Sequence, residues 1–156
     1  MNLEFPDGSP FSTGSCRYLD HIPGGDSGHP RIYIDVEIHG QRTLAAVDTG
    51  GVYVICDPHL ASIIDFSAAE FISIESVSTW NRKYNGKLYR LPLAILADEG
   101  ETLVLDVTVF IPDDLGPDEP WPFPTAIIGY SGGLERLRFA VSPAHQPDSR
   151  FFFGPV

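Results

Sequence analysis

The chain contains 156 residues, which is enough for one domain with its own hydrophobic core, and 43% of them are hydrophobic. Its net charge of −11, from 21 acidic and 10 basic residues, argues against binding to nucleic acid or to an anionic membrane surface. The sequence has neither an apolar run long enough for a transmembrane helix nor a basic, apolar leader. We therefore expect a cytoplasmic protein without a membrane segment.

The first thirty residues are rich in Gly, Pro, Ser and Asp and follow no steady hydrophobic period. They predict an extended, flexible arm (residues 1–30) before a folded domain (residues 31–156). From Ile32 onward, apolar residues alternate with polar ones or form short apolar runs, both typical of strands. We expect strands at 32–38, 43–47, 52–55, 71–77, 91–95, 103–111, 126–129, 137–141 and 151–153.

Three further signals predict the positions of a helix and two connections. Asp57-Pro58 is typical of an N-cap followed by the first helical residue, which predicts a short helix through about Ile64. Asn85-Gly86 is the strongest hairpin-turn signal in the chain. Five prolines between Pro112 and Pro124 predict a loop. Together these patterns predict a mostly β fold with one or two short helices.

The acidic residues are concentrated in one part of the chain. No Lys or Arg occurs from Leu91 to Leu134, where eight acidic residues lie: Asp98, Glu99, Glu101, Asp106, Asp113, Asp114, Asp118 and Glu119. A solvated acidic face is the simplest interpretation. A patch that attracts basic peptides is the alternative.

The clearest chemical signal is Asp48-Thr49-Gly50, which directly follows the apolar strand 44–47. A carboxylate on a tight turn can share one proton with a second carboxylate, so that one acts as base and the other as acid. Gly50 allows the backbone to turn tightly beside a substrate. A similar tripeptide, Asp26-Ser27-Gly28, follows no apolar strand and is interpreted as a polar turn.

The order of motifs resembles the retropepsin-like (retroviral-type) aspartic proteases. In that family an apolar strand ends in Asp-Thr/Ser-Gly, a hairpin flap follows, and an apolar-apolar-Gly strand packs behind the catalytic turn. Here Asp48-Thr49-Gly50, the Asn85-Gly86 hairpin and Ile127-Ile128-Gly129 occur in this order, and the resemblance covers about residues 31–141. It implies a single-lobe acid protease barrel that cleaves a peptide or protein substrate without a cofactor.

The resemblance also implies roles for individual residues. Asp48 would be the catalytic aspartate, and Thr49 would hold the two catalytic turns together by hydrogen bonds across a subunit interface. Gly50 would complete the turn, and Gly129 would let the supporting strand pack closely. The flap would contain Trp80, Tyr84, Asn85 and Gly86, with the two aromatic side chains covering the substrate.

The number of motifs predicts the oligomeric state. Pepsin-like enzymes carry two such tripeptides in one long chain, whereas this chain has one that follows an apolar strand. The resemblance therefore implies a homodimer in which the two copies of Asp48 meet on the two-fold axis. Phe151-Phe152-Phe153 either pairs at that interface or forms an ordinary core strand.

Other chemistries have weaker support. Gly129–Gly133 fits the G-x-S-x-G elbow around Ser131, but the expected order of acid and His after the serine is missing. The two cysteines, Cys16 and Cys56, are interpreted as buried hydrophobes, and no signature marks a His partner that would make Cys56 a nucleophile. The spacing of the five histidines (His21, His29, His39, His59 and His145) predicts no metal site. A catalytically inactive module of the same fold, used for dimerisation or peptide binding, remains the alternative function.

Overall fold

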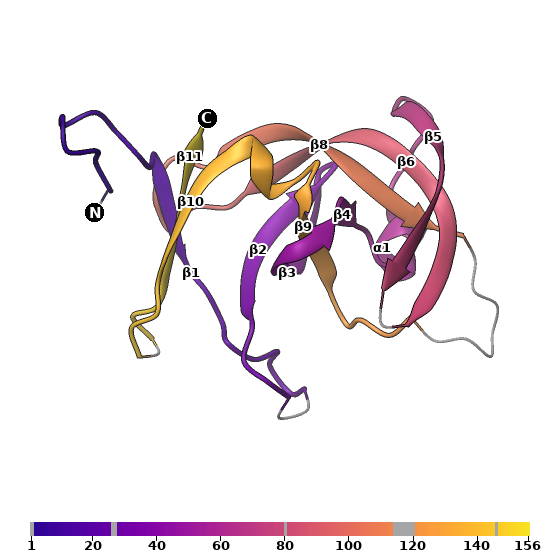
Figure 1. The fold of residues 1–156 in the computed structure, drawn as a ribbon, viewed down its shortest axis with the longest axis horizontal. Coiled ribbons are helices and arrows are strands. Elements are labelled where there is room, and N and C mark those ends of the chain that lie inside the picture. Colours follow the sequence, from indigo (N-terminus) through magenta and orange to yellow (C-terminus); the bar gives the residue numbers. More distant parts are fainter. Residues whose placement is uncertain (1, 26–27, 80, 114–120, 146) are drawn as a thin grey trace.

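The computed structural model describes residues 2–25, 28–79, 81–113, 121–145 and 147–156. Strands predominate, which confirms the predicted mostly β fold (Figure 1). The elements in chain order are β1 (Gly14–Arg17), β2 (Ile32–Ile38), β3 (Gln41–Val52), β4 (Val54–Ile55), α1 (Pro58–Ile63), β5 (Glu70–Thr79), β6 (Arg82–Ile95), β7 (Glu99–Gly100), β8 (Leu103–Pro112), β9 (Ala126–Ser131), a 3-10 turn (Leu134–Arg136), β10 (Leu137–Ser142) and β11 (Arg150–Pro155).

The larger sheet has seven strands in the order β2-β3-β9-β4-β8-β6-β5. An additional pairing between β2 and β6 joins strands from opposite parts of this order, so that six strands form a closed ring of hydrogen-bonded neighbours with β5 outside it. The core lies on the inner faces of these strands. In β2 the alternation seen in the sequence buries Ile34, Val36 and Ile38 and leaves Asp35 exposed.

The smaller sheet has the order β10-β11-β1-β7 and lies at one end of the molecule (left in Figure 1). Strand β11 pairs antiparallel with β1 on one edge and with β10 on the other, and Phe151, Phe152 and Phe153 are all buried. Within this chain the three phenylalanines therefore form a core strand, and neither edge of β11 is open to a partner.

The same sheet includes part of the segment expected to be a flexible arm. Gly14–Arg17 pairs residue by residue with β11, and Cys16 is buried with only 3% of its surface exposed. A side chain at Gly14 would collide with the Phe153 ring and the Glu101 carbonyl, so a small residue is required at this contact. This part of the arm thus packs into the fold instead of extending from it.

The prediction of a hairpin turn at Asn85-Gly86 is wrong. Both residues lie inside β6, where Asn85 pairs with Ser76 of β5 and Gly86 pairs with Glu75. The two strands remain paired as far as Thr79 and Arg82, and Asn81 has a left-handed backbone conformation with φ of 59°. Gly86 is needed for space, because a Cβ there would lie 2.7 Å from the Phe110 ring and would also collide with the Ile111 carbonyl.

The short helix follows the prediction closely. Asp57 is the N-cap, Pro58 is the first helical residue, and the Asp57 Oδ1 atom accepts a hydrogen bond from the Leu60 N–H at 2.9 Å. Leu60 of this helix is buried in the core. Within the described ranges, no helix is both long and apolar enough to cross a membrane.

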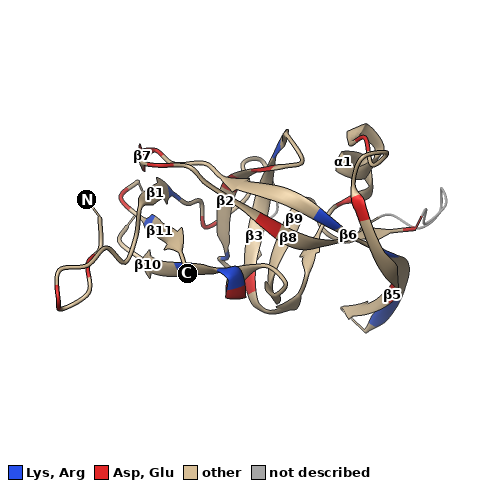
Figure 2. Cartoon of the chain, turned by 90° about the horizontal axis from the view of Figure 1, so that it is seen from above, with Lys and Arg blue, Asp and Glu red and all other residues tan. Residues whose placement is uncertain are grey.

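Part of the acidic segment pairs with basic residues of this chain. The Asp98 carboxylate accepts a hydrogen bond from the Arg17 N–H at 2.6 Å, and Arg150 forms an ion pair with Glu99 at 2.7 Å. These contacts link β1, β7 and β11. Figure 2 shows acidic and basic residues distributed over several elements of the molecule. Asp114, Asp118 and Glu119 lie outside the described residues.

Candidate active site

Asp48 lies near the end of β3, where this strand runs parallel to β9 and Asp48 is opposite Gly129. The register of this pairing shifts between Asp48 and Val52, so the intervening residues leave the regular ladder and form a turn. The Gly50 N–H donates a hydrogen bond to Asp48 Oδ1 at 3.0 Å. Asp48 is half-buried, whereas Thr49 and Gly50 are exposed, so the turn presents its carboxylate at the surface of this chain.

The backbone of β9 braces this turn from behind. Strand β9 lies between β3 and β4, which are consecutive in the chain. The Gly129 N–H donates to the Tyr53 carbonyl at 2.8 Å, and the Tyr53 N–H donates to the Ser131 carbonyl at 2.7 Å. Tyr53 has a φ of 60°, which fits the sharp change of direction between β3 and β4.

Two glycines leave room for this close approach. A Cβ at Gly129 would lie 2.5 Å from the Tyr53 carbonyl oxygen and 2.8 Å from the Val52 carbonyl carbon, closer than van der Waals contact allows. A Cβ at Gly51 would lie 3.2 Å from Asp48 Oδ2. A side chain at Gly129 would therefore displace the backbone of the turn, and one at Gly51 would press on the Asp48 carboxylate.

A small cavity of about 50 Å³ opens beside Asp48. Its walls come from β2 and β3, from β9, and from the segment just before β9; the lining residues are Arg31, Tyr33, Ala46, Asp48, Phe123, Pro124, Thr125 and Ile127. Asp48 is the one carboxylate among the described residues that line it. A single copy of the chain therefore presents one carboxylate at this cavity.

The flap candidates that the structure describes, Tyr84, Asn85 and Gly86, do not line this cavity. Tyr84 is buried with 4% exposure in a second hydrophobic cluster with Phe110 and Ile127, and its ring lies 5.0 Å from the Trp121 ring. Asn85 accepts a hydrogen bond from the Ser76 hydroxyl at 2.8 Å, across β5 and β6. Gly86 is buried inside the sheet, and Trp80 lies outside the described residues.

The sequence interpretation missed the residues of the cavity wall. Arg31 lies directly before β2 and Tyr33 lies at its start, while Phe123, Pro124 and Thr125 come from the irregular segment before β9. No periodic pattern marks these positions. The one signal available was the position of the proline-rich segment directly before Ile127-Ile128-Gly129.

The other chemical candidates gain no support from the geometry. Ser131 is exposed at the end of β9 and is followed by a 3-10 turn, not by the helix of a nucleophile elbow. Burial raises the pKa of the Cys16 thiol to about 12, with a further contribution from Asp98, and burial also raises the pKa of Cys56. Both cysteines are buried and unpaired, as expected. No group of three His, Cys, Asp or Glu side chains suited to a metal ion occurs within the described ranges.

Known proteins provide a comparison for the fold. No family model and no curated protein matches the sequence. A retropepsin-like aspartic protease from Rickettsia conorii has a similar structure, with a TM-score of 0.51 and 16% identity over 90% of each chain. Basic 7S globulin from soybean gives a TM-score of 0.59 and 10% identity over 94% of this chain and 51% of its own, so this chain spans about half of that protein. The chain therefore has a mostly β fold similar to that of a retropepsin-like aspartic protease, with Asp48-Thr49-Gly50 on a turn braced by Gly129.

Proposed function

We propose that this chain is an aspartic endopeptidase that acts as a homodimer and hydrolyses peptide bonds with a water molecule activated by two copies of Asp48. The observation that carries this proposal is the position of Asp48, half-buried on a glycine turn beside a cavity and braced by Gly129. The likeness to a solved aspartic protease supports a hydrolase of this class.

The chemistry requires a second carboxylate close to the first. Two carboxylates that face each other at short range share one proton, because both cannot ionise together. The ionised group takes a proton from the attacking water, and the protonated group donates one to the carbonyl oxygen of the substrate. One copy of the chain supplies one such group at its cavity, and a symmetric dimer would supply both.

The surface around the turn is suited to contact with a second copy. Thr49 and Gly50 are exposed, and the nearby side chains of Val52 and Tyr130 keep 43% and 49% of their surfaces exposed. Thr49 would donate hydrogen bonds to the partner's turn. Val52 and Tyr130 would supply apolar area, which stabilises an interface through the hydrophobic effect.

The β5–β6 hairpin is our proposed flap within a single-lobe barrel, with its tip beyond Thr79 and Arg82 and not at Asn85-Gly86. Tyr84 would anchor the hairpin through its packing with Trp121, instead of covering the substrate directly. The hairpin is the outermost part of the larger sheet, because β5 pairs with β6 alone in the described sheet order. A peptide would bind between this hairpin and the turn at Asp48.

The proposal is tested by comparing purified wild type with Asp48→Asn on a peptide library from about pH 4 to pH 7. The dimer content of each sample is measured at the same time. We expect cleavage by the wild type alone, with a bell-shaped pH profile whose two apparent pKa values belong to the pair of carboxylates. Equal cleavage by both proteins would show that Asp48 is not the catalytic group.

A second function is favoured by one specific observation. The cavity at Asp48 has a volume of only about 50 Å³, and none of the described flap candidates lines it. A catalytically inactive module that dimerises or binds peptides would fit such a site. It would form dimers and bind peptides equally well with Asp or Asn at position 48, and it would cleave nothing.

A further inference from the structure

A second and larger cavity adjoins the one at Asp48. It has a volume of about 430 Å³ and is lined by His21, Ile22, Gly25, Gly28, His29, Arg31, Tyr33 and Pro124. Arg31, Tyr33 and Pro124 line both cavities, so the larger one begins where the smaller one ends. A peptide bound at Asp48 could therefore place a neighbouring side chain in this larger cavity.

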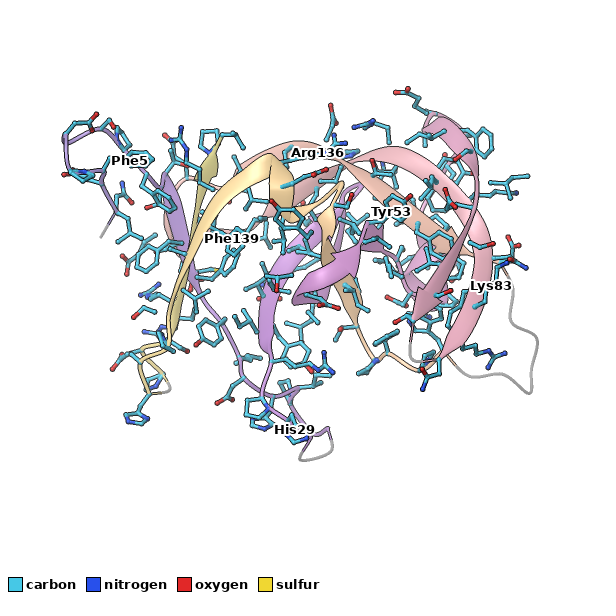
Figure 3. The ribbon with its side chains drawn as sticks, viewed as in Figure 1. Phe5, His29, Tyr53, Lys83, Arg136 and Phe139 are labelled. Atoms are coloured by element: carbon cyan, nitrogen blue, oxygen red, sulfur yellow. The ribbon has the colours of Figure 1, made fainter. Side chains whose placement is uncertain are left out.

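The larger cavity has an arginine and two histidines in its described wall, in a protein whose net charge is −11. Its described lining residues include Arg31, His21 and His29 but no Asp or Glu. Figure 3 shows His29 beside the lower end of β2, well away from Tyr53. Two acidic groups belong to its described surroundings: Asp20 pairs with His21, and Asp48 lines the smaller cavity.

The backbone of Arg31 is held in place, whereas its guanidinium has no partner among the described residues. Its backbone N–H donates to the Asp20 carbonyl at 2.9 Å, which fixes the start of β2. Its guanidinium forms no hydrogen bond or ion pair with any described residue. By contrast, Arg42 on the neighbouring strand pairs with Asp35 at 3.1 Å. A guanidinium without a described partner at the wall of a cavity is suited to bind a carboxylate through two parallel hydrogen bonds.

His21 is held in the wall of this cavity by two polar contacts. Its Nδ1 atom lies 3.1 Å from Asp20 Oδ1, and its Nε2 atom lies 3.2 Å from the Gly28 carbonyl oxygen. These two contacts tie His21 and Gly28 together at the cavity wall.

We propose that the cavity lined by His21, His29 and Arg31 is a specificity subsite that binds the carboxylate of a Glu or Asp side chain, with Arg31 as its main ligand. This inference rests on the proposed function, because the peptide bond next to that residue is the one that Asp48 would hydrolyse. Charge-assisted hydrogen bonds to a guanidinium contribute enough binding energy to favour an acidic over a neutral substrate by about tenfold.

The test uses matched peptides that carry Glu, Gln or Lys at one position and an amidated C-terminus, so that the side chain is the variable carboxylate. The ratio of kcat/KM for Glu over Gln is measured at each position around the cleaved bond. We expect a ratio of about ten at one position in the wild type and a ratio near one in Arg31→Gln. Arg42→Gln is the matched control, because Arg42 lines neither cavity, and it should keep the wild-type ratio.

A binding measurement separates this inference from the proposed function. Fluorescence polarisation with labelled Glu and Gln peptides is carried out on Asp48→Asn, with and without Arg31→Gln. Tighter binding of the Glu peptide that is lost with Arg31→Gln supports the subsite, even if the wild type cleaves nothing. Equal binding of the two peptides, or a Glu preference that survives Arg31→Gln, overturns the subsite while leaving any Asp48-dependent cleavage intact.

Discussion

Asp48 and Gly129 lie opposite each other in the parallel pairing of β3 and β9, and the space that a side chain at Gly129 would need is filled by the backbone of the Asp48 turn. The position of the Asp48 carboxylate therefore depends on β9, a strand that lies much later in the sequence. A substitution at Gly129 should therefore alter the position of the Asp48 carboxylate without removing any chemical group of the site.

We predict that Gly129→Ala destabilises the protein by about 3 kcal/mol or more and lowers any Asp48-dependent activity more than the loss of folded protein explains. The new methyl group would lie 2.5 Å from the Tyr53 carbonyl oxygen, and this contact involves backbone that cannot rotate away. Urea denaturation measures the change in the free energy of unfolding, and activity is compared at equal folded fraction.

Gly28→Ala is the control for Gly129→Ala. Position 28 has open space around its Cβ and needs no left-handed backbone, so the same substitution should change stability by less than about 0.5 kcal/mol. If Gly129→Ala were as mild as Gly28→Ala, β9 would not brace the turn as described.

The position of the hairpin turn leads to a second prediction. Asn81 has a left-handed φ of 59°, a conformation that glycine adopts without strain, so Asn81→Gly should be neutral or slightly stabilising. Asn85 lies inside β6 and accepts a hydrogen bond from Ser76, so Asn85→Gly should destabilise by about 1 kcal/mol. The opposite order of the two effects would place the turn at Asn85-Gly86 after all.

Local patterns in the sequence predicted those parts of the fold whose cause is local. The alternation at Ile34, Val36 and Ile38 predicted β2, and Asp57-Pro58 predicted the start of α1. Asn85-Gly86 led to a wrong prediction because Gly86 is needed to leave room for the Phe110 ring, and Phe110 lies far along the chain. The pairing of β1 with β11 could not be predicted either, because no pattern near Cys16 in the sequence indicates that this residue pairs with Phe151.

In the candidate site, too, some residues could be identified from local motifs in the sequence, whereas others meet only through the tertiary fold. The family resemblance singled out Asp48 and Gly129, and the structure places the two residues opposite each other. The walls of the adjoining cavities were not predicted, because Arg31 and Pro124 meet there only through the tertiary fold. Tyr84 was correctly noted as part of the hairpin, but its burial against Trp121 depends on a contact between distant segments.

A third prediction concerns the helix cap. Asp57→Ala should destabilise the protein by about 1 kcal/mol, because the Leu60 N–H loses its hydrogen-bond partner. Asp57→Asn keeps an acceptor at the same position and should change stability by only a few tenths of that amount. Thermal unfolding of the three proteins checks the order; equal losses for both variants would show that the charge of Asp57, not its capping bond, matters.

A fourth prediction follows from the raised pKa of Cys16. Burial raises this pKa from 9.0 to about 12, so above pH 9 the unfolded thiol releases its proton while the folded thiol keeps it. The contribution of Cys16 to stability is therefore complete below pH 9 and falls by about 1.4 kcal/mol for each pH unit above it.

Urea denaturation between about pH 8 and pH 10.5 measures this dependence. Cys16→Ala should reduce the steepness of the decline, and the slopes are compared because the smaller side chain also lowers stability at every pH. Identical slopes in wild type and Cys16→Ala would mean that the thiol at position 16 is accessible to solvent in the folded protein.

The central claim is that two copies of Asp48 act together, and mixing wild type with Asp48→Asn tests it most directly. The two proteins are unfolded and refolded together at constant total concentration, and cleavage of one peptide is measured as the wild-type fraction changes. If each active site needs both carboxylates, activity follows the square of that fraction, so an equal mixture retains about a quarter of the wild-type rate. A rate that falls in direct proportion to the wild-type fraction would show that each chain works alone and would contradict the dimeric site.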